Sequence, residues 1–316
     1  MTGFILRRLV LMIPVLVVVA VIIFSLLHVT PGDPAALMAG EDATAAQVEA
    51  MRERLGLNRP FHTQFIDWFA NALRLDLGES IFLRQPVTEA MMERVQPTGL
   101  LTLYSLSLAI LISIPAGVIA AVRRNSWVDR LLMVMSISGA AIPSFFLGIL
   151  LIMLFAVILG WLPPGGYTDI GDDLVDHLKH MLLPSLALGF SAAGLLSRMV
   201  RSTMLDVLQE DYVRTAYAKG LPQRTVVLLH ALRNALIPAM TVLGITLAGL
   251  LGGAVVIETV FNLPGMGRLV VQSIARRDFP VIQGVVLITA VIQVLVMLLV
   301  DVLYVYVDPR VRYGSD

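Results

Sequence analysis

The sequence predicts an all-α integral membrane protein with six transmembrane helices. Hydrophobic residues make up 57% of the 316-residue chain and charged residues only 15%, so it is far more apolar than an average soluble domain. Long uncharged stretches recur along the chain, each close to the length that a helix needs to cross a bilayer. Arginines gather in alternate connections between them, which predicts a multi-pass protein with both termini in the cytoplasm.

The uncharged stretches define the predicted spans. The first contains 19 residues and follows Arg7 and Arg8; since the apolar region of a signal peptide is shorter, an uncleaved helix is favoured over a cleaved signal. The third would be about 45 Å long at about 1.5 Å per residue, so it must tilt, kink at Pro143 or begin as a surface segment. The six spans are Leu9–Leu27, Leu100–Val122, Leu131–Trp161, Met181–Ser197, Asn234–Ile257 and Phe279–Val300.

The chain divides into a first membrane helix (1–28), an exoplasmic helical insert (29–98), a five-helix core (99–310) and a short cytoplasmic tail (311–316). Three helices are predicted in the insert. Thr44 and Gln47 fit a capping box with Gly56 as the stop, Pro60 precedes an aromatic stripe, and Pro86 opens a third short helix. The stripe favours packing within the insert, with the membrane interface or a soluble partner as alternatives. It consists of Phe61, Phe65, Trp68, Phe69 and Leu73.

Two predicted spans carry small residues at every fourth position, which gives each helix one smooth face. Such faces let helix backbones approach closely in lipid, so helix packing is the favoured interpretation. Lining a solute path that opens and closes is the alternative. The faces consist of Ser105, Ala109, Ser113, Gly117 and Ala121 in the second span, and of Gly244, Ala248 and Gly252 in the fifth.

The sequence lacks the residues or motifs that several kinds of chemistry require. Cysteine is absent, which excludes disulfides and thiolate sites. No phosphate-loop, zinc-protease or serine-hydrolase motif is present, so the chain is predicted not to be an enzyme and to need no cofactor. The zero net charge and the lack of a long basic run argue against nucleic-acid binding.

A few polar residues could still form sites. A polar cap before the fourth span explains the acids and histidines there better than a metal site does. Asp301 interrupts the last apolar run. A structural ion pair of Asp301 with an arginine of an inner loop is favoured over a role of Asp301 in a proton-coupled carrier. Gln283 and Gln293 are expected to form hydrogen bonds between helices. The cap residues are Asp172, Asp173, Asp176, His177 and His180.

The longest charged interruption in the second half of the chain is Arg201 to Pro238. Apolar side chains recur at helical spacing from Met204 to Lys219, which predicts a short amphipathic cytoplasmic helix. Gly220 suits a left-handed C-cap and Pro222 the first turn of a further helix. The region is therefore predicted to be a helix, a tight turn and a second helix.

These residues resemble a known family. DYVRTAYAKG, followed by HALRNALIP, is similar to the cytoplasmic signature, the EAA motif, of ABC importer permeases in its dipeptide and oligopeptide permease B-subunit form. Further motifs of that form recur in order along the chain. They are FILRRL, HVTPGDPA, LGLNRP, DLGES, IPSFF, ETVFNLPGMG and DVLYVYVDPRVRY.

The sequence departs from the generic signature in three ways. Arg214, Thr215 and Ala216 replace Glu-Ala-Ala, Gly220 lies farther from Pro238 than the consensus allows, and Tyr217 replaces a common basic residue. The resemblance still implies that the helix of 204–220 docks on an ATPase. The residues expected to carry this coupling are Asp211, Tyr212, Arg214, Thr215, Ala216, Lys219 and Gly220.

The resemblance implies a type I (MetI-like) ABC importer permease in a bacterial or archaeal inner membrane. Its implied partners are a homologous second permease, two cytoplasmic ABC ATPases, an extracytoplasmic solute-binding protein and the lipid bilayer. The chain would form half of the translocation pathway, for a dipeptide, oligopeptide, glutathione or nickel complex. The alternative is a self-sufficient carrier or channel that uses Asp301.

Overall fold

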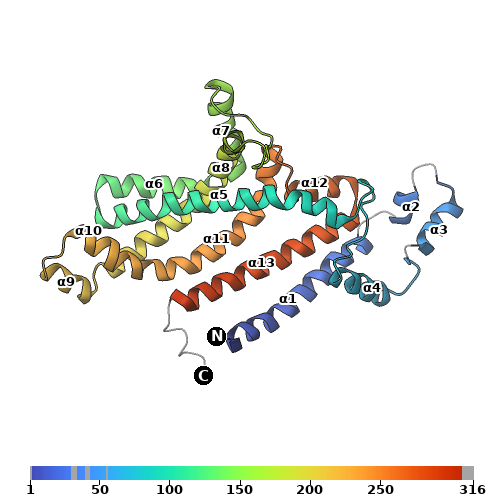
Figure 1. The fold of residues 1–316 in the computed structure, drawn as a ribbon, viewed down its shortest axis with the longest axis horizontal. Coiled ribbons are helices and arrows are strands. Elements are labelled where there is room, and N and C mark those ends of the chain that lie inside the picture. Colours follow the sequence, from blue (N-terminus) through green and yellow to red (C-terminus); the bar gives the residue numbers. More distant parts are fainter. Residues whose placement is uncertain (1, 30–33, 40–42, 55, 308–316) are drawn as a thin grey trace. The chain divides into compact units, whose positions relative to one another are not determined.

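The computed structural model describes residues 2–29, 34–39, 43–54 and 56–307, and the regular elements within these ranges are helices (Figure 1). One isolated β-bridge pairs Glu79 with Pro86. Among the described residues, five helices are long and apolar enough to cross a membrane, and the number is six if a bent helix pair forms one span. This agrees with the six predicted spans. The five candidates are Arg7–Val29, Val87–Val122, Leu174–Val207, Gln223–Val260 and Phe279–Val302.

The chain forms two compact units, and the division does not follow the order of the sequence. The first unit combines Met1–Val95 with Leu269–Val294. It contains four complete helices, the start of α5 and parts of α12 (Met266–Arg276) and α13 (Phe279–Val307). The complete helices are α1 (Thr2–Val29), α2 (Pro34–Ala39), α3 (Ala45–Arg54) and α4 (Phe61–Leu73).

Local sequence signals position the helices of the first unit. The capping box before α3 is confirmed: Gln47 Oε1 accepts from Thr44 N at 2.8 Å, and Thr44 Oγ1 accepts from Gln47 N at 3.4 Å. Gly56 follows with a left-handed φ of +66°. The aromatic stripe of α4 packs on α1, with the rings of Phe24 and Trp68 5.4 Å apart. The stripe therefore holds the insert to the first membrane helix, and the favoured prediction that it packs within the insert is wrong for these rings.

The third helix of the insert begins where it was predicted, but it is not short. A helix begins directly after Pro86, at Val87, and this helix, α5, runs without a break to Val122. Pro97 lies inside it, where a polar-to-apolar change in the sequence suggested a boundary. The insert therefore passes directly into the second span.

The second unit combines Gln96–Arg268 with Leu295–Asp316. Within it, α8 packs against α5, α6, α7 and α11. Glycines allow the closest approaches, since a side chain at Gly189 would meet the backbone of Ser105 and one at Gly194 that of Ser136. Its further elements are α6 (Trp127–Ala141), α7 (Ser144–Leu151), η1 (Ile152–Ile158), α8 (Leu174–Val207), α9 (Asp211–Ala218), α10 (Gln223–Thr225), η2 (Val226–Ala231) and α11 (Leu232–Val260).

The third span bends at Pro143, one of the outcomes that the sequence allowed. The helix pair on either side of this proline meets at 105°. Ile142 has an extended ψ of 123°, as expected for a residue before proline, and Pro143 occupies the N-cap position before α7 begins at Ser144. Because a proline ring excludes the helical backbone at the residue before it, the bend is fixed by the local sequence.

Candidate functional site

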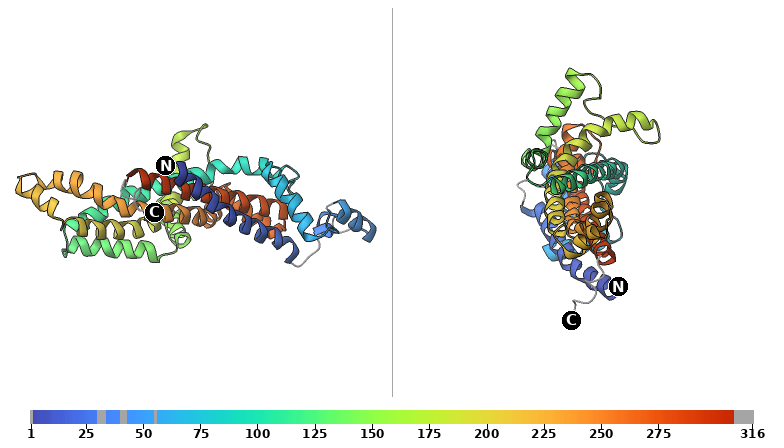
Figure 2. Two further views of the ribbon diagram at one scale, coloured as in Figure 1. Left: turned by 90° about the horizontal axis from the view of Figure 1, so that it is seen from below. Right: turned by 90° about the vertical axis from the view of Figure 1, so that its left-hand side faces the viewer.

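The helix α9 is held against the chain by one apolar side. Val213 and Ala216 are buried and pack with Val226 and Leu208. These residues lie three apart on α9, which places them on one face of the helix. Figure 2 shows α9 at the same end of the second unit as the connection between α5 and α6. The opposite side of α9 remains open.

The predicted helix of 204–219 is two helices. The long helix α8 continues to Val207, and Glu210 has an extended ψ of 146° before α9 begins at Asp211. The last turn of α8 closes with a bond from Glu210 N to Val207 O, the tighter three-residue spacing that is common at a helix end. The apolar periodicity continues across this break, and therefore the sequence alone suggested one helix.

Gly220 ends α9 in the predicted left-handed conformation. Its φ is +78°. Gly220 N donates to Tyr217 O at 2.9 Å, and Leu221 N donates to Ala216 O at 3.4 Å. This is the hydrogen-bond pattern of a Schellman motif, which satisfies the last carbonyls of a helix. Apart from its own chain neighbours, no described residue has a heavy atom within 4 Å of the position of a Cβ at Gly220, so the requirement for glycine comes from the backbone and not from crowding.

Tyr212 connects α9 to the start of α11. Asn234 Nδ2 donates to the Tyr212 hydroxyl at 2.7 Å, and that hydroxyl donates to His230 O at 3.4 Å. Tyr217, on the same short helix, has no comparable bond in the described part of the chain. Tyr212 therefore links α9 to α11 by a hydrogen bond, in addition to the apolar contact of α9 with Val226 of η2.

The predicted coupling residues differ in exposure. Six are exposed, and Arg214 Nη1 contacts Asp211 Oδ1 at 3.5 Å within α9. Ala216, by contrast, is only 7% exposed because it faces η2. The resemblance implies a coupling role for Ala216, but its side chain packs against its own chain. The exposed residues are Asp211, Tyr212, Arg214, Thr215, Lys219 and Gly220.

A hollow of about 580 Å³ lies beside α10 in the second unit. Its wall includes Val118 and Arg123 at the end of α5 and Arg224 and Val227 next to α9. Two exposed guanidinium groups border a mainly apolar surface there. Such a surface is suited to a partner with an apolar anchor and acidic side chains around it.

A largely buried ion pair lies at the end of the second unit that carries α9 and α10. Asp129 lies in the first turn of α6, and Ser126 caps that turn by accepting from Asp129 N at 3.2 Å. The Asp129 carboxylate accepts from Arg201 on α8 and from Asn125 N. The spacing of Ser126 and Asp129 signals the start of a helix in the sequence, but nothing in it identifies Arg201 as the partner.

The two faces of small residues have different surroundings. On α5, Ser105, Ala109 and Ser113 are buried, and a Cβ at Gly117 would lie 2.7 Å from Val200 Cβ on α8. This face is covered within the chain. On α11 the exposure increases along the face, from buried Gly244 through half-buried Ala248 to exposed Gly252. Only the end of the second face near Gly252 is open to another molecule or to a pathway.

The loop after α11 is built around Glu258, which the sequence analysis did not single out. This fully buried carboxylate accepts from Thr98 Oγ1 at 2.5 Å and from Arg268 N at 2.9 Å. Thr98 Oγ1 also accepts from Met266 N at 2.8 Å. Glu258 and Thr98 therefore fix the NLPGMG turn and the start of α12. The motif containing Glu258 was visible in the sequence, but its threonine partner was not.

The acids and histidines before the fourth span have structural contacts. Asp173 caps α8 by accepting from Val175 N and Asp176 N. His177 is fully buried, with Nδ1 2.7 Å from Thr168 O, and its ring lies against Tyr167. Burial raises the pKa of the Tyr167 hydroxyl above its ordinary value, with smaller contributions from Asp169 and Tyr104. No group of three metal-ligating side chains was found among the described residues.

Three polar residues of α13 complete the predicted candidates. Asp301 is half-buried and takes part in a polar or electrostatic interaction; an arginine partner for it stays a prediction. Gln283 was expected to form a hydrogen bond between helices, but its buried Nε2 has no partner among the described residues. Gln293 lies exposed on the same helix.

Family models and full-length relatives together cover nearly all of the chain. Residues 113–313 match the family described as the binding-protein-dependent transport system inner membrane component, and residues 1–102 match the N-terminal region of such components. Glutathione transport system permease proteins of Escherichia coli K12 and Salmonella typhimurium are each 45% identical over 313 residues, covering 99% of this chain and all of theirs. A solved chain of the inward-facing MetNI methionine ABC transporter superposes with a TM-score of 0.57 at 21% identity, covering 69% of this chain and 95% of that one.

Proposed function

The chain belongs to the family of binding-protein-dependent transport system inner membrane components, and from this premise we propose that it is the permease of an ATP-driven ABC importer for a peptide-like solute. The relatives that match end to end are glutathione permeases, which supports a peptide carrying several polar groups. The chain would form half of the pathway, with a homologous permease forming the other half. Two ATPases and an extracytoplasmic solute-binding protein would complete the assembly.

The observation that carries the coupling proposal is the two-sided character of α9. Val213 and Ala216 attach one side to the chain, while Asp211, Arg214 and Lys219 leave a polar side open. A helix that is attached on one side and open on the other can transmit the movement of a docked partner. Differential docking in the ATP-bound and ATP-free states would bias the packing of the membrane helices.

The proposed orientation places α9 in the cytoplasm with both chain termini. Arg7 and Arg8 precede the first span, and Arg123 and Arg124 follow the second, as the positive-inside rule expects. The hollow beside α10 would then lie on the cytoplasmic side, where Arg123 and Arg224 favour acidic side chains of an ATPase. The polar cap of α8 and the insert would face outward.

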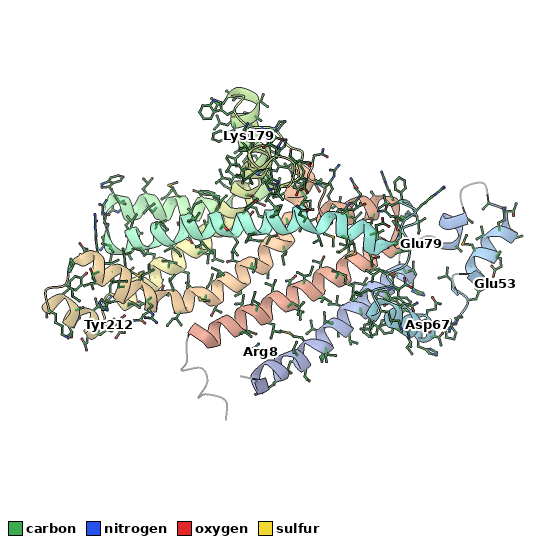
Figure 3. The ribbon with its side chains drawn as sticks, viewed as in Figure 1. Arg8, Glu53, Asp67, Glu79, Lys179 and Tyr212 are labelled. Atoms are coloured by element: carbon green, nitrogen blue, oxygen red, sulfur yellow. The ribbon has the colours of Figure 1, made fainter. Side chains whose placement is uncertain are left out.

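The absence of cysteine allows a direct test by single-cysteine cross-linking. Arg214→Cys and Lys219→Cys are expected to cross-link to the co-expressed ATPase, with a yield that changes when ATP is added. Lys179→Cys is the matched control, since Lys179 is exposed at the opposite end of α8 from the α9 side (Figure 3). Equal cross-linking from Lys179→Cys, or none from the two α9 variants, would contradict the proposed docking site.

A further inference from the structure

A cavity of about 400 Å³ lies within the first unit, between α1, α4 and the start of α13. Its volume lies in the range of sites that enclose small molecules. Phe24, Trp68 and Phe279 contribute aromatic walls, whereas Arg59 and Asp67 contribute charges. Phe24 and Trp68 also pack α4 on α1, but the coupling described above does not use this cavity.

The charged wall presents a cation and an anion side by side. Arg59 Nη1 lies 2.6 Å from Asp67 Oδ2, and both side chains are 55% exposed. A guanidinium has five N–H donors and a carboxylate two oxygens, so this contact leaves donors on Arg59 and one oxygen on Asp67 available. Figure 3 shows Asp67 on α4. The pair can therefore bind an adjacent carboxylate and ammonium without being broken.

The inner wall contains an amide that lacks a partner. Gln283 is only 6% exposed, lines the cavity, and has no acceptor for its buried Nε2 among the described residues. Leaving a buried donor unsatisfied is costly. A carbonyl or carboxylate oxygen of a ligand beside Gln283 would supply the missing acceptor. Asn71 provides a second side-chain amide on the wall.

We propose that this cavity binds a solute with an α-amino-acid head, in which ammonium and carboxylate share one carbon, joined to an amide-bearing body. The head would bind to Arg59 and Asp67, the amide oxygen to Gln283, and the apolar part would contact Trp68 and Phe24. A γ-glutamyl peptide has this arrangement. In an ordinary α-linked peptide, the free ammonium and carboxylate lie on different carbons and cannot both reach the adjacent pair in the same way.

The proposed binding site adds a solute contact to the proposed importer function. It rests on that function for one point, the placement of the cavity on the outer side of the membrane. It would give the permease its own contact with the solute, separate from the solute-binding protein. The binding chemistry itself follows from the lining residues. Binding and transport are therefore measured separately.

Two isomeric probes test the binding. γ-Glutamyl-leucine and α-glutamyl-leucine have the same atoms and net charge, but only the first keeps ammonium and carboxylate on one carbon. Binding is measured by calorimetry on the full-length chain in phosphatidylcholine nanodiscs, without ATPase or binding protein. We expect the γ isomer to bind at least tenfold more tightly. Equal binding of the two isomers, or no binding of either, overturns the proposal.

Variants assign the preference to the cavity. Arg59→Gln and Asp67→Asn should each weaken binding of the γ isomer about tenfold and reduce the ratio of the affinities for the γ and α isomers. Gln283→Leu should weaken binding of both isomers. Arg74→Gln and Gln293→Leu are matched controls, since both side chains are exposed and neither lines the cavity. An unchanged isomer preference in Arg59→Gln and Asp67→Asn would place the binding elsewhere.

A lipid headgroup is the competing source of a zwitterion. Nanodiscs with added phosphatidylethanolamine should leave the affinity for γ-glutamyl-leucine unchanged, and competition by this lipid would overturn the proposal. Uptake by the assembled importer is then measured separately. If the purified chain binds the γ isomer but cells show no ATP-driven uptake, the proposed importer is contradicted and the proposed site is not. If cells show uptake but the purified chain does not bind the γ isomer, the proposed site alone is contradicted.

Discussion

Arg201 and Asp129, which lie 72 positions apart, form a bidentate ion pair: Arg201 Nε donates to Asp129 Oδ1 at 2.6 Å and Arg201 Nη2 to Oδ2 at 2.8 Å. Their side chains are 24% and 5% exposed. The pair joins the first turn of α6 to the last part of α8. It therefore fixes the α5–α6 connection relative to the helix that leads into α9.

Removing one partner of this pair should destabilise the protein. Arg201→Gln leaves the buried Asp129 carboxylate with Asn125 N as its one remaining donor among the described residues, so we expect the free energy of unfolding in detergent to decrease by about 2–3 kcal/mol. Asp129→Asn in the same chain should recover part of the loss, because the uncompensated charge is removed. Arg198→Gln, an exposed position on the same helix, serves as control. Equal effects at both arginines would show that the pair is not responsible.

Tyr212→Phe should weaken coupling more than stability. It deletes the hydroxyl that contacts Asn234 and His230, which costs about 1 kcal/mol for a neutral hydrogen bond. The expected result is a lower ratio of solute imported to ATP hydrolysed in reconstituted importer. Tyr217→Phe is the matched control on the same helix, since no bond of its hydroxyl was found in the described chain. A normal ratio in Tyr212→Phe would remove this tyrosine from the coupling path.

Gly220→Val should abolish uptake by disrupting the end of α9. A β-branched residue at φ +78° is strained by about 1–2 kcal/mol, and relieving the strain would break the Schellman bonds. Gly220→Asn should retain much of the activity, because asparagine tolerates the left-handed conformation. Uptake, with expression level as a control, decides the result. Wild-type uptake in Gly220→Val would refute the role of the turn.

Two glycines on different helices should respond differently to the same substitution. Gly117→Ala places a Cβ against Val200 and the Ser197 carbonyl, so overpacking of about 1–3 kcal/mol is expected. Gly252→Ala has no atom within 4 Å and should leave the stability of the isolated chain unchanged. A loss of uptake or assembly in Gly252→Ala would then identify this end of α11 as a pathway or partner surface. Equal thermal stability of both variants would contradict the packing at Gly117.

The sequence determined the features that depend on neighbouring residues. The apolar runs located the spans, Thr44 and Gln47 predicted the start of α3, Pro143 predicted the bend, and Gly220 predicted the end of α9. Each feature follows from hydrophobic length, a capping side chain or the backbone preference of one residue. These effects act within a few residues, so they can be predicted without knowing the rest of the fold.

Only the tertiary structure decided which face of each helix contacts a neighbouring segment. It paired Arg201 with Asp129, joined Thr98 to Glu258, and turned Ala216 toward its own chain. It also left the buried Nε2 of Gln283, beside a cavity, without a hydrogen-bond partner among the described residues. In a membrane helix nearly every side is apolar, so hydrophobic periodicity does not indicate which face meets a neighbour. Close packing of small residues and hydrogen bonds between distant segments determine that choice.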